Sequence, residues 1–188
     1  MDKLELKDIA PYIGYELNFY CEDTESGEYE ILGVSKIDLS MELFEIGSCD
    51  YTWDNIGNDS KGVICKPILR PMSDLTKEIT HNGETFVPME KLAQIAFERL
   101  DTFHIHSDIE IITAYKTDEN EAYRTLKYNA DNKSFVVSVL DENLFRIRNL
   151  ATKNQYDLFQ KLCEWHIDFQ DLIGRGLAIN LNEVDNGK

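Results

Sequence analysis

The chain has 188 residues, of which 43% are hydrophobic and 11% aromatic, so it can bury the core of one domain or of two small ones. Its net charge of −16 repels phosphate backbones, which speaks against direct nucleic-acid binding. No segment reaches the roughly 18 consecutive apolar residues of a membrane helix, and the charged N-terminus does not resemble a secretion signal. Four cysteines stand far apart without a CxxC pair, which favours reduced thiols in a cytosol: Cys21, Cys49, Cys65 and Cys163.

The negative charge is concentrated in the first third of the chain. Residues 1–62 contain 15 acidic and 4 basic residues, a net −11 out of the total of −16. Such a concentration indicates either an acidic surface that only keeps the protein in solution, or an acidic interaction face. In the second case the partner is a basic protein, or the face imitates the phosphates of a nucleic acid.

Residues 1–72 predict an acidic antiparallel β-region. Apolar and polar residues alternate over 15–22, the period of a half-buried strand, and further strands are expected at 29–37, 41–46 and 63–69. Pro67 and Pro71 predict that the last of these strands lies at a sheet edge, or that the prolines lie at its ends. Short strands with short links favour an antiparallel sheet or a small barrel.

Residues 73–188 predict an α+β region that forms one compact unit with the first. Asn82-Gly83 between two strand-like runs predicts a β-hairpin, because both residues tolerate the positive φ of a type I′ turn. Pro88 suits the first position of a helix that is expected to reach about Leu100. Residues 104–150 predict a second antiparallel group, in which 144–147 either extends the sheet or begins a helix.

A long amphipathic helix is expected near the C-terminus. Thr152 or Asn154 can cap its start, it carries a broad apolar face, and it ends before Gly174, a typical residue after a helix end. A short strand over 178–181 and a fraying polar tail are expected to follow. The apolar seam consists of Leu158, Leu162, Trp165, Phe169 and Leu172.

One short segment has the composition of a metal site. His104, His106 and Asp108 would share one face of a strand, and this HxHxD spacing is similar to the zinc-binding motif of metallo-β-lactamase-like hydrolases. Ile109 stands where that motif has its next histidine. The alternative to a zinc site is two strand histidines that face solvent.

A basic group stands out in the acidic chain and is a candidate docking site. Lys66, Arg70 and Lys77 would bind an anion or a protein partner, or would pair internally with acidic residues. Cys163 and His166, three residues apart, form a second candidate for metal binding or an activated thiol. The alternative for this pair is an ordinary place in the core.

Three segments resemble uncharacterised proteins of Bacteroidetes phages and prophage-like elements: LELKDIAPYIGYEL, KPILRPMSDLTKEITHNGETFVP and KLCEWHIDFQDLIGRGLAINLNEV. The resemblance covers both ends and the centre but not residues 103–150. It implies a bacterial cytoplasm and a virus–host setting, and it transfers no activity or site residue. The sequence therefore favours a non-enzymatic, protein-binding accessory protein. The alternatives are an acidic nucleic-acid mimic that counters host defence, and a metal-dependent hydrolase that uses the HxHxD segment.

Overall fold

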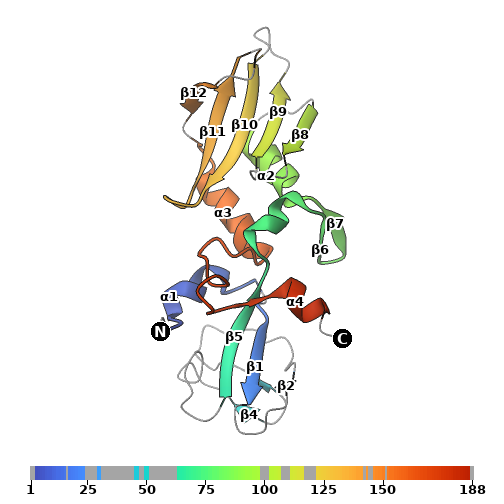
Figure 1. Cartoon of the computed structure of the whole chain (residues 1–188), viewed down its shortest axis with the longest axis vertical. Helices are drawn as coiled ribbons and strands as arrows, with labels where there is room; N and C mark the ends of the chain where they lie inside the picture. Colours follow the sequence, from blue (N-terminus) through green and yellow to red (C-terminus); the bar gives the residue numbers. More distant parts are fainter. Residues whose placement is uncertain are drawn as a thin grey trace. The chain divides into compact units, whose positions relative to one another are not determined.

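The computed structural model describes most of the chain, namely residues 3–15, 17–23, 29–30, 45–46, 49–50, 63–97, 102–106, 111–116, 122–141, 143, 146–150 and 152–186. Its contacts divide the chain into two compact units. The first unit comprises Met1–Pro71 and Cys163–Lys188, and the second unit comprises Met72–Leu162. Helices and largely antiparallel sheets occur together, which confirms the predicted α+β class (Figure 1).

The first unit contains a four-stranded sheet in the order β13-β5-β1-β2. The antiparallel prediction is confirmed for the pairs that β1 makes with β2 and β5, whereas β13 pairs with β5 in parallel. Two further short strands, β3 and β4, pair with each other. The strands described in this unit are β1 (Phe19–Asp23), β2 (Tyr29–Glu30), β3 (Glu45–Ile46), β4 (Cys49–Asp50), β5 (Val63–Leu69) and β13 (Ile179–Asn180).

Strand β5 has described neighbours on both sides, β1 along most of its length and β13 at its end, so it is an edge strand only in part. The Ile68 N–H donates to the Asn18 carbonyl beside β1, at 2.8 Å, so Pro67 turns its ring nitrogen to the opposite side. On that side β13 pairs only with Ile68 and Leu69. Pro67 therefore lies at a position where none of the described strands requires its missing N–H.

Two short helical segments lie near the N-terminus: α1 (Leu6–Ile9) and the 3-10 helix η1 (Ala10–Tyr12). Their apolar side chains join β1, β5 and the C-terminal segment in one buried cluster. The cluster consists of Leu4, Ile9, Tyr12, Leu17, Phe19, Leu69, Cys163, Leu172, Leu177 and Ala178.

The second unit is built on a five-stranded antiparallel sheet in the order β12-β11-β10-β9-β8 (Figure 1). Residues 146–150 pair with β11, so residues 146 and 147 of the segment that the sequence left open belong to a strand, while residues 144–145 lie outside the described residues. The strands are β8 (Thr102–His106), β9 (Ile111–Lys116), β10 (Ala122–Asn129), β11 (Ser134–Leu140) and β12 (Arg146–Leu150).

The predicted hairpin and connecting helix are present. Strands β6 (Ile79–His81) and β7 (Glu84–Phe86) flank Asn82 and Gly83, whose φ angles of 50° and 80° are those of a type I′ turn. The 3-10 helix η3 (Met72–Thr76) precedes this hairpin. Helix α2 (Pro88–Ala96) begins at the predicted proline and ends before Leu100, because Phe97 adopts an extended conformation.

The long C-terminal helix is not present. Helix α3 covers only Gln155–Glu164, and the chain leaves the helical conformation at His166, where φ is 57°. Within the second unit, Phe159 on α3 meets Tyr128 and Phe135 of the sheet, with ring centroids 6.4 and 5.6 Å away. The expected fraying tail is also wrong over residues 181–186, which form helix α4 (Leu181–Asn186).

Candidate functional site

The most elaborate polar arrangement lies in the first unit, where the N-terminal helical segment meets residues 166–175. Asp8 on α1 is buried, and its carboxylate accepts a hydrogen bond of 2.8 Å from the Glu5 N–H. The same carboxylate lies 3.5 Å from the Arg175 guanidinium, and the Asp8 carbonyl accepts a 2.5 Å bond from the Gln170 amide. Asp8 thus caps its own helix and ties the two ends of the chain together.

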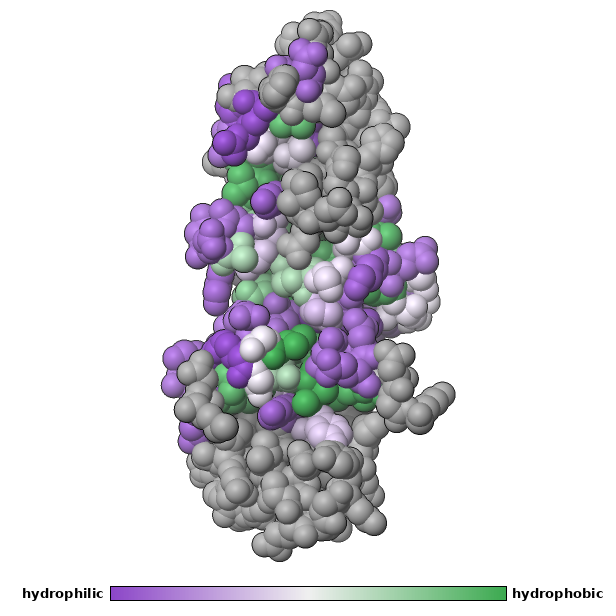
Figure 2. Space-filling view, in the orientation of Figure 1, coloured by the Kyte–Doolittle hydropathy of each residue, from purple (hydrophilic) through white to green (hydrophobic). Residues whose placement is uncertain are grey.

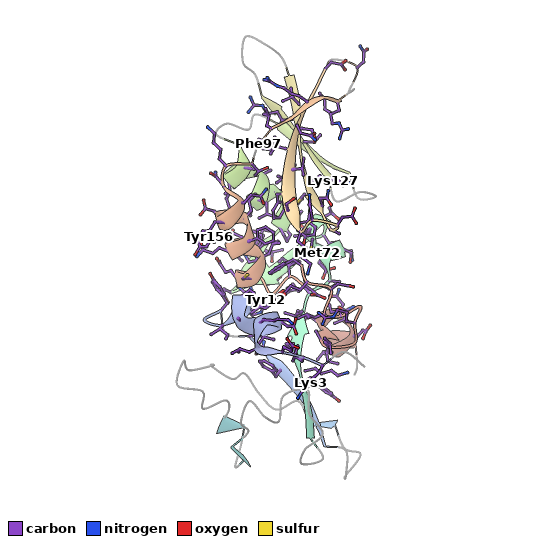
Figure 3. All side chains as sticks on the ribbon, turned by 90° about the vertical axis from the view of Figure 1, so that its left-hand side faces the viewer. Lys3, Tyr12, Met72, Phe97, Lys127 and Tyr156 are labelled. Carbon is purple, nitrogen blue, oxygen red and sulfur yellow. The ribbon has the colours of Figure 1, made fainter. Side chains whose placement is uncertain are left out.

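Tyr12 and His166 make a second connection between the same segments. The Tyr12 hydroxyl donates to the Ile167 carbonyl at 2.9 Å, and His166 Nε2 lies 2.5 Å from the Tyr15 carbonyl. Tyr12 is fully buried, and Figure 3 labels it in the N-terminal segment. Burial, together with the nearby Asp168 carboxylate, raises the pKa of the Tyr12 hydroxyl. Tyr12 therefore keeps its proton and acts as a hydrogen-bond donor.

Asp168 organises the turn that replaces the end of the predicted helix. Its carboxylate accepts backbone bonds of 2.9 Å from Leu172 and 2.7 Å from Ile173. Burial outweighs these two donors and raises the pKa of the Asp168 carboxyl. The segment is joined to the end of β5 by a pair of 2.8 Å bonds, from the Arg70 N–H to the His166 carbonyl and from the Asp168 N–H to the Arg70 carbonyl.

The described polar groups of this arrangement bond to the backbone. Tyr12, His166 and Asp168 all contact main-chain atoms. Burial raises the pKa of the Cys163 thiol to about 11, which suppresses the thiolate that nucleophilic attack requires. The predicted activated thiol is therefore not favoured: Cys163 is part of the hydrophobic core.

The HxHxD segment falls on β8 and on residues beyond the described part of the chain. His104 pairs with Thr113 and His106 pairs with Ile111 in the backbone register, while Asp108 lies outside the described residues. Among the side chains that the structure describes, no group of three or more His, Cys, Asp or Glu could hold a metal ion. A zinc site at 104–108 stays a prediction.

The three predicted docking cations belong to two different units. Lys66 lies on β5 opposite Tyr20, and Arg70 forms the parallel bridge with Ile167, both in the first unit. Lys77 belongs to the second unit and forms a 3.0 Å salt bridge with the buried Asp74 carboxylate. For Lys77, internal pairing is thus observed, and docking by the group stays a prediction.

The two compact units differ strongly in charge. The first unit contains 20 acidic and 8 basic residues, a net −12, with histidine counted as neutral. The second unit contains 15 acidic and 11 basic residues, a net −4. Because residues 163–188 add 5 acids and 2 bases to the first unit, the acidic part extends beyond the N-terminal third of the chain.

Sequence reasoning missed Asp8, Tyr12 and Asp168 as organising residues. The local sequence around these residues gives no signal of this role, because their partners lie elsewhere in the chain: Ile167, the partner of Tyr12, is 155 residues away. The chain matches no protein-family model, no curated protein and no solved structure. None of the described helices is long and apolar enough to cross a membrane.

Proposed function

We propose that the protein is a non-enzymatic accessory protein whose first unit binds a basic protein partner. The observation that carries this proposal is the charge of that unit, a net −12, against −4 for the second unit. An excess of one sign on one compact unit produces a field that attracts partners of the opposite sign and raises their association rate.

The chemistry of the polar groups in the first unit supports a binding role over catalysis. Tyr12 and Asp168 form hydrogen bonds with backbone groups, and the Cys163 thiol lies protonated in the core. An enzyme of this size would present a nucleophile or a base within reach of a substrate. The groups described in this unit instead stabilise a fixed scaffold on which acidic side chains are carried.

The setting that we propose is a phage or another mobile element within a bacterial cytoplasm. It rests on the resemblance of the three sequence segments and on the scattered cysteines. A virus-derived protein that acts through an acidic surface would bind a basic protein of its host or of its own element. The proposed setting does not depend on the charge of the first unit, and the proposed binding does not depend on the setting.

Binding of a Lys- and Arg-rich peptide, measured by titration calorimetry at several salt concentrations, tests the proposal. We expect binding that weakens steeply as salt rises, because screened charges carry it. The double variant Asp171→Asn with Glu183→Gln removes two charges from exposed side chains of the first unit and should weaken binding severalfold.

The matched control removes the same number of charges from the second unit. Glu78→Gln with Asp157→Asn changes two exposed acids there and should leave the affinity almost unchanged. Equal losses in both double variants would show that only the net charge matters, and they would contradict a binding face on the first unit. No measurable binding at low salt would also contradict it.

A further inference from the structure

Three adjacent strands of the second unit carry only basic charges. Strands β10, β11 and β12 contain four cationic residues and no aspartate or glutamate, in a chain with 35 acidic and 19 basic residues. The four are Arg124 and Lys127 on β10 and Arg146 and Arg148 on β12. Figure 3 labels Lys127.

In the part of the chain that the structure describes, these four cations have no acidic partner. Within the described residues, none of the four forms a salt bridge, and the buried Nε of Arg124 has no hydrogen-bond partner. In contrast, Lys77 pairs with Asp74, Lys91 with Glu84, and Arg175 with Asp8. An acidic chain that leaves adjacent cations unpaired has a surface suited to an anionic partner from outside the unit.

Strand β12 ends the sheet, and no described strand pairs with its outer side. The side chains of Arg146, Arg148 and Asn149 are exposed. Figure 2 shows hydrophilic residues gathered on the surface in this part of the second unit. The outer side of a terminal strand offers alternating N–H and C=O groups that another strand can complete.

The register sets the two arginines on opposite faces of this edge. Arg146 lies beside Leu140 and Arg148 lies beside Val139. Leu140 and Val139 are successive residues of β11 and point to opposite faces, and so do the arginines beside them, because the register of β12 shifts between them. Arg124 lies on the other side of Val139, in the same cross-strand row as Arg148. A segment added alongside β12 would also alternate its side chains between the two faces, so acids at neighbouring positions would each meet an arginine.

We propose that the outer edge of β12 binds an extended, acidic segment of a partner protein by strand addition. A polypeptide backbone presents donors and acceptors at the spacing of the strand edge, which favours a peptide over a nucleic acid. Arg146 and Arg148, together with the register irregularity at Val139 and Leu140, make the edge of β12 unfavourable for pairing with most strands. An acidic strand is the kind that the cations attract. The site lies in the second unit and is independent of the proposed role of the first.

Fluorescence anisotropy tests this binding on the full chain, with a labelled peptide in which pairs of adjacent glutamates alternate with single valines, so that glutamates lie on both faces of the added strand. The double variant Arg146→Glu with Arg148→Glu should bind about tenfold more weakly or worse, since each contact becomes repulsive. The control variant Lys133→Glu with Lys153→Glu changes two exposed cations outside the three strands and should keep the affinity. Circular dichroism establishes that both variants are folded.

A second peptide tests the strand geometry. Replacing its valines by proline keeps the charge and removes backbone donors, so binding should be lost. Equal binding of the proline peptide, equal loss in the two double variants, or tighter binding of single-stranded DNA would each overturn the proposal. Self-association that depends on Arg146 and Arg148 would also overturn it, in favour of a second copy of the chain.

Discussion

At the scale of single residues, the structure uses its buried polar groups to hold distant segments together. Asp8, Tyr12 and Asp168 are buried in the first unit, and each contacts a backbone group or an ion-pair partner. A buried polar group destabilises the fold unless it has a hydrogen-bond partner. Removing one member of a buried pair therefore leaves the other member unsatisfied and lowers the free energy of unfolding. These contacts should therefore be sensitive to conservative substitutions.

Tyr12→Phe removes the hydroxyl that donates to the Ile167 carbonyl and leaves that carbonyl without this donor. We expect the free energy of unfolding to fall by about 1–3 kcal/mol. Urea unfolding, followed by circular dichroism, measures it. The matched control is Tyr156→Phe, because Tyr156 is 74% exposed, and it should change stability very little. Equal effects of the two variants would contradict a specific role for the Tyr12 hydroxyl.

The raised pKa of the Asp168 carboxyl predicts in which direction the stability of the protein changes with pH. Burial raises the pKa of its carboxyl above the ordinary 3.8, so the folded state binds this proton more tightly than the unfolded state. Its stabilising contribution is complete below the ordinary pKa and is lost as the pH rises through the raised value.

The difference in unfolding free energy between the wild type and Asp168→Asn isolates this contribution. Over a pH series the wild type should lose its advantage as the pH rises from about 4. All other carboxyl groups titrate in both proteins, so their contributions to the pH dependence cancel in the difference between the two free energies of unfolding. A difference that stays constant with pH, or that grows as the pH rises, would show that the burial effect is outweighed by the two backbone donors.

At the scale of elements, sequence patterns succeeded where the determining contacts are local. The hairpin at 79–86 and the start of α2 at Pro88 follow from the conformational preferences of Asn82-Gly83 and of proline. The end of α3 does not follow from such preferences. Apolar residues continue with helical spacing through Leu172, but the chain turns at His166 to bond with Arg70, which lies on another segment.

The hairpin turn gives a prediction at this scale. Gly83→Ala places a side chain at φ 80°, and the left-handed conformation costs an L-residue roughly 1–2 kcal/mol. Nothing lies within 4 Å of the added Cβ, so the expected loss of unfolding free energy comes from the backbone alone. Thermal unfolding measures it. Asn82→Gly, which keeps a residue suited to positive φ, should cost less; the reverse order would contradict the type I′ assignment.

At the scale of the whole molecule, the chain forms the first unit from its two ends. Residues 163–188 contribute Leu172, Leu177 and Ala178 to the core of that unit, together with β13, which pairs with β5. Residues 72–162 form the second unit between those two parts of the sequence. The first unit therefore depends on a segment that follows the second unit in the chain.

Truncation after Leu162 tests this dependence. The shortened chain loses four members of the buried cluster, so we expect residues 63–69 to lose protection in hydrogen exchange measured by mass spectrometry. Residues 134–140 should remain protected, because β11 pairs with β10 and β12 within the second unit. Unchanged protection of β5, or loss of protection in both sheets, would contradict the division into two units.

Four features could be predicted from the amino-acid sequence: the α+β class, the hairpin, the antiparallel group near 104–150 and the uneven charge. Each of these follows from local preference, from the period of apolar residues or from counting. Tertiary structure alone decided that α3 ends at Glu164, that residues 163–188 join the first unit, and that Arg146 and Arg148 lie on a terminal strand. Those features depend on pairs of residues far apart in the chain, and a pattern within one segment contains no information about the segment with which it will pair.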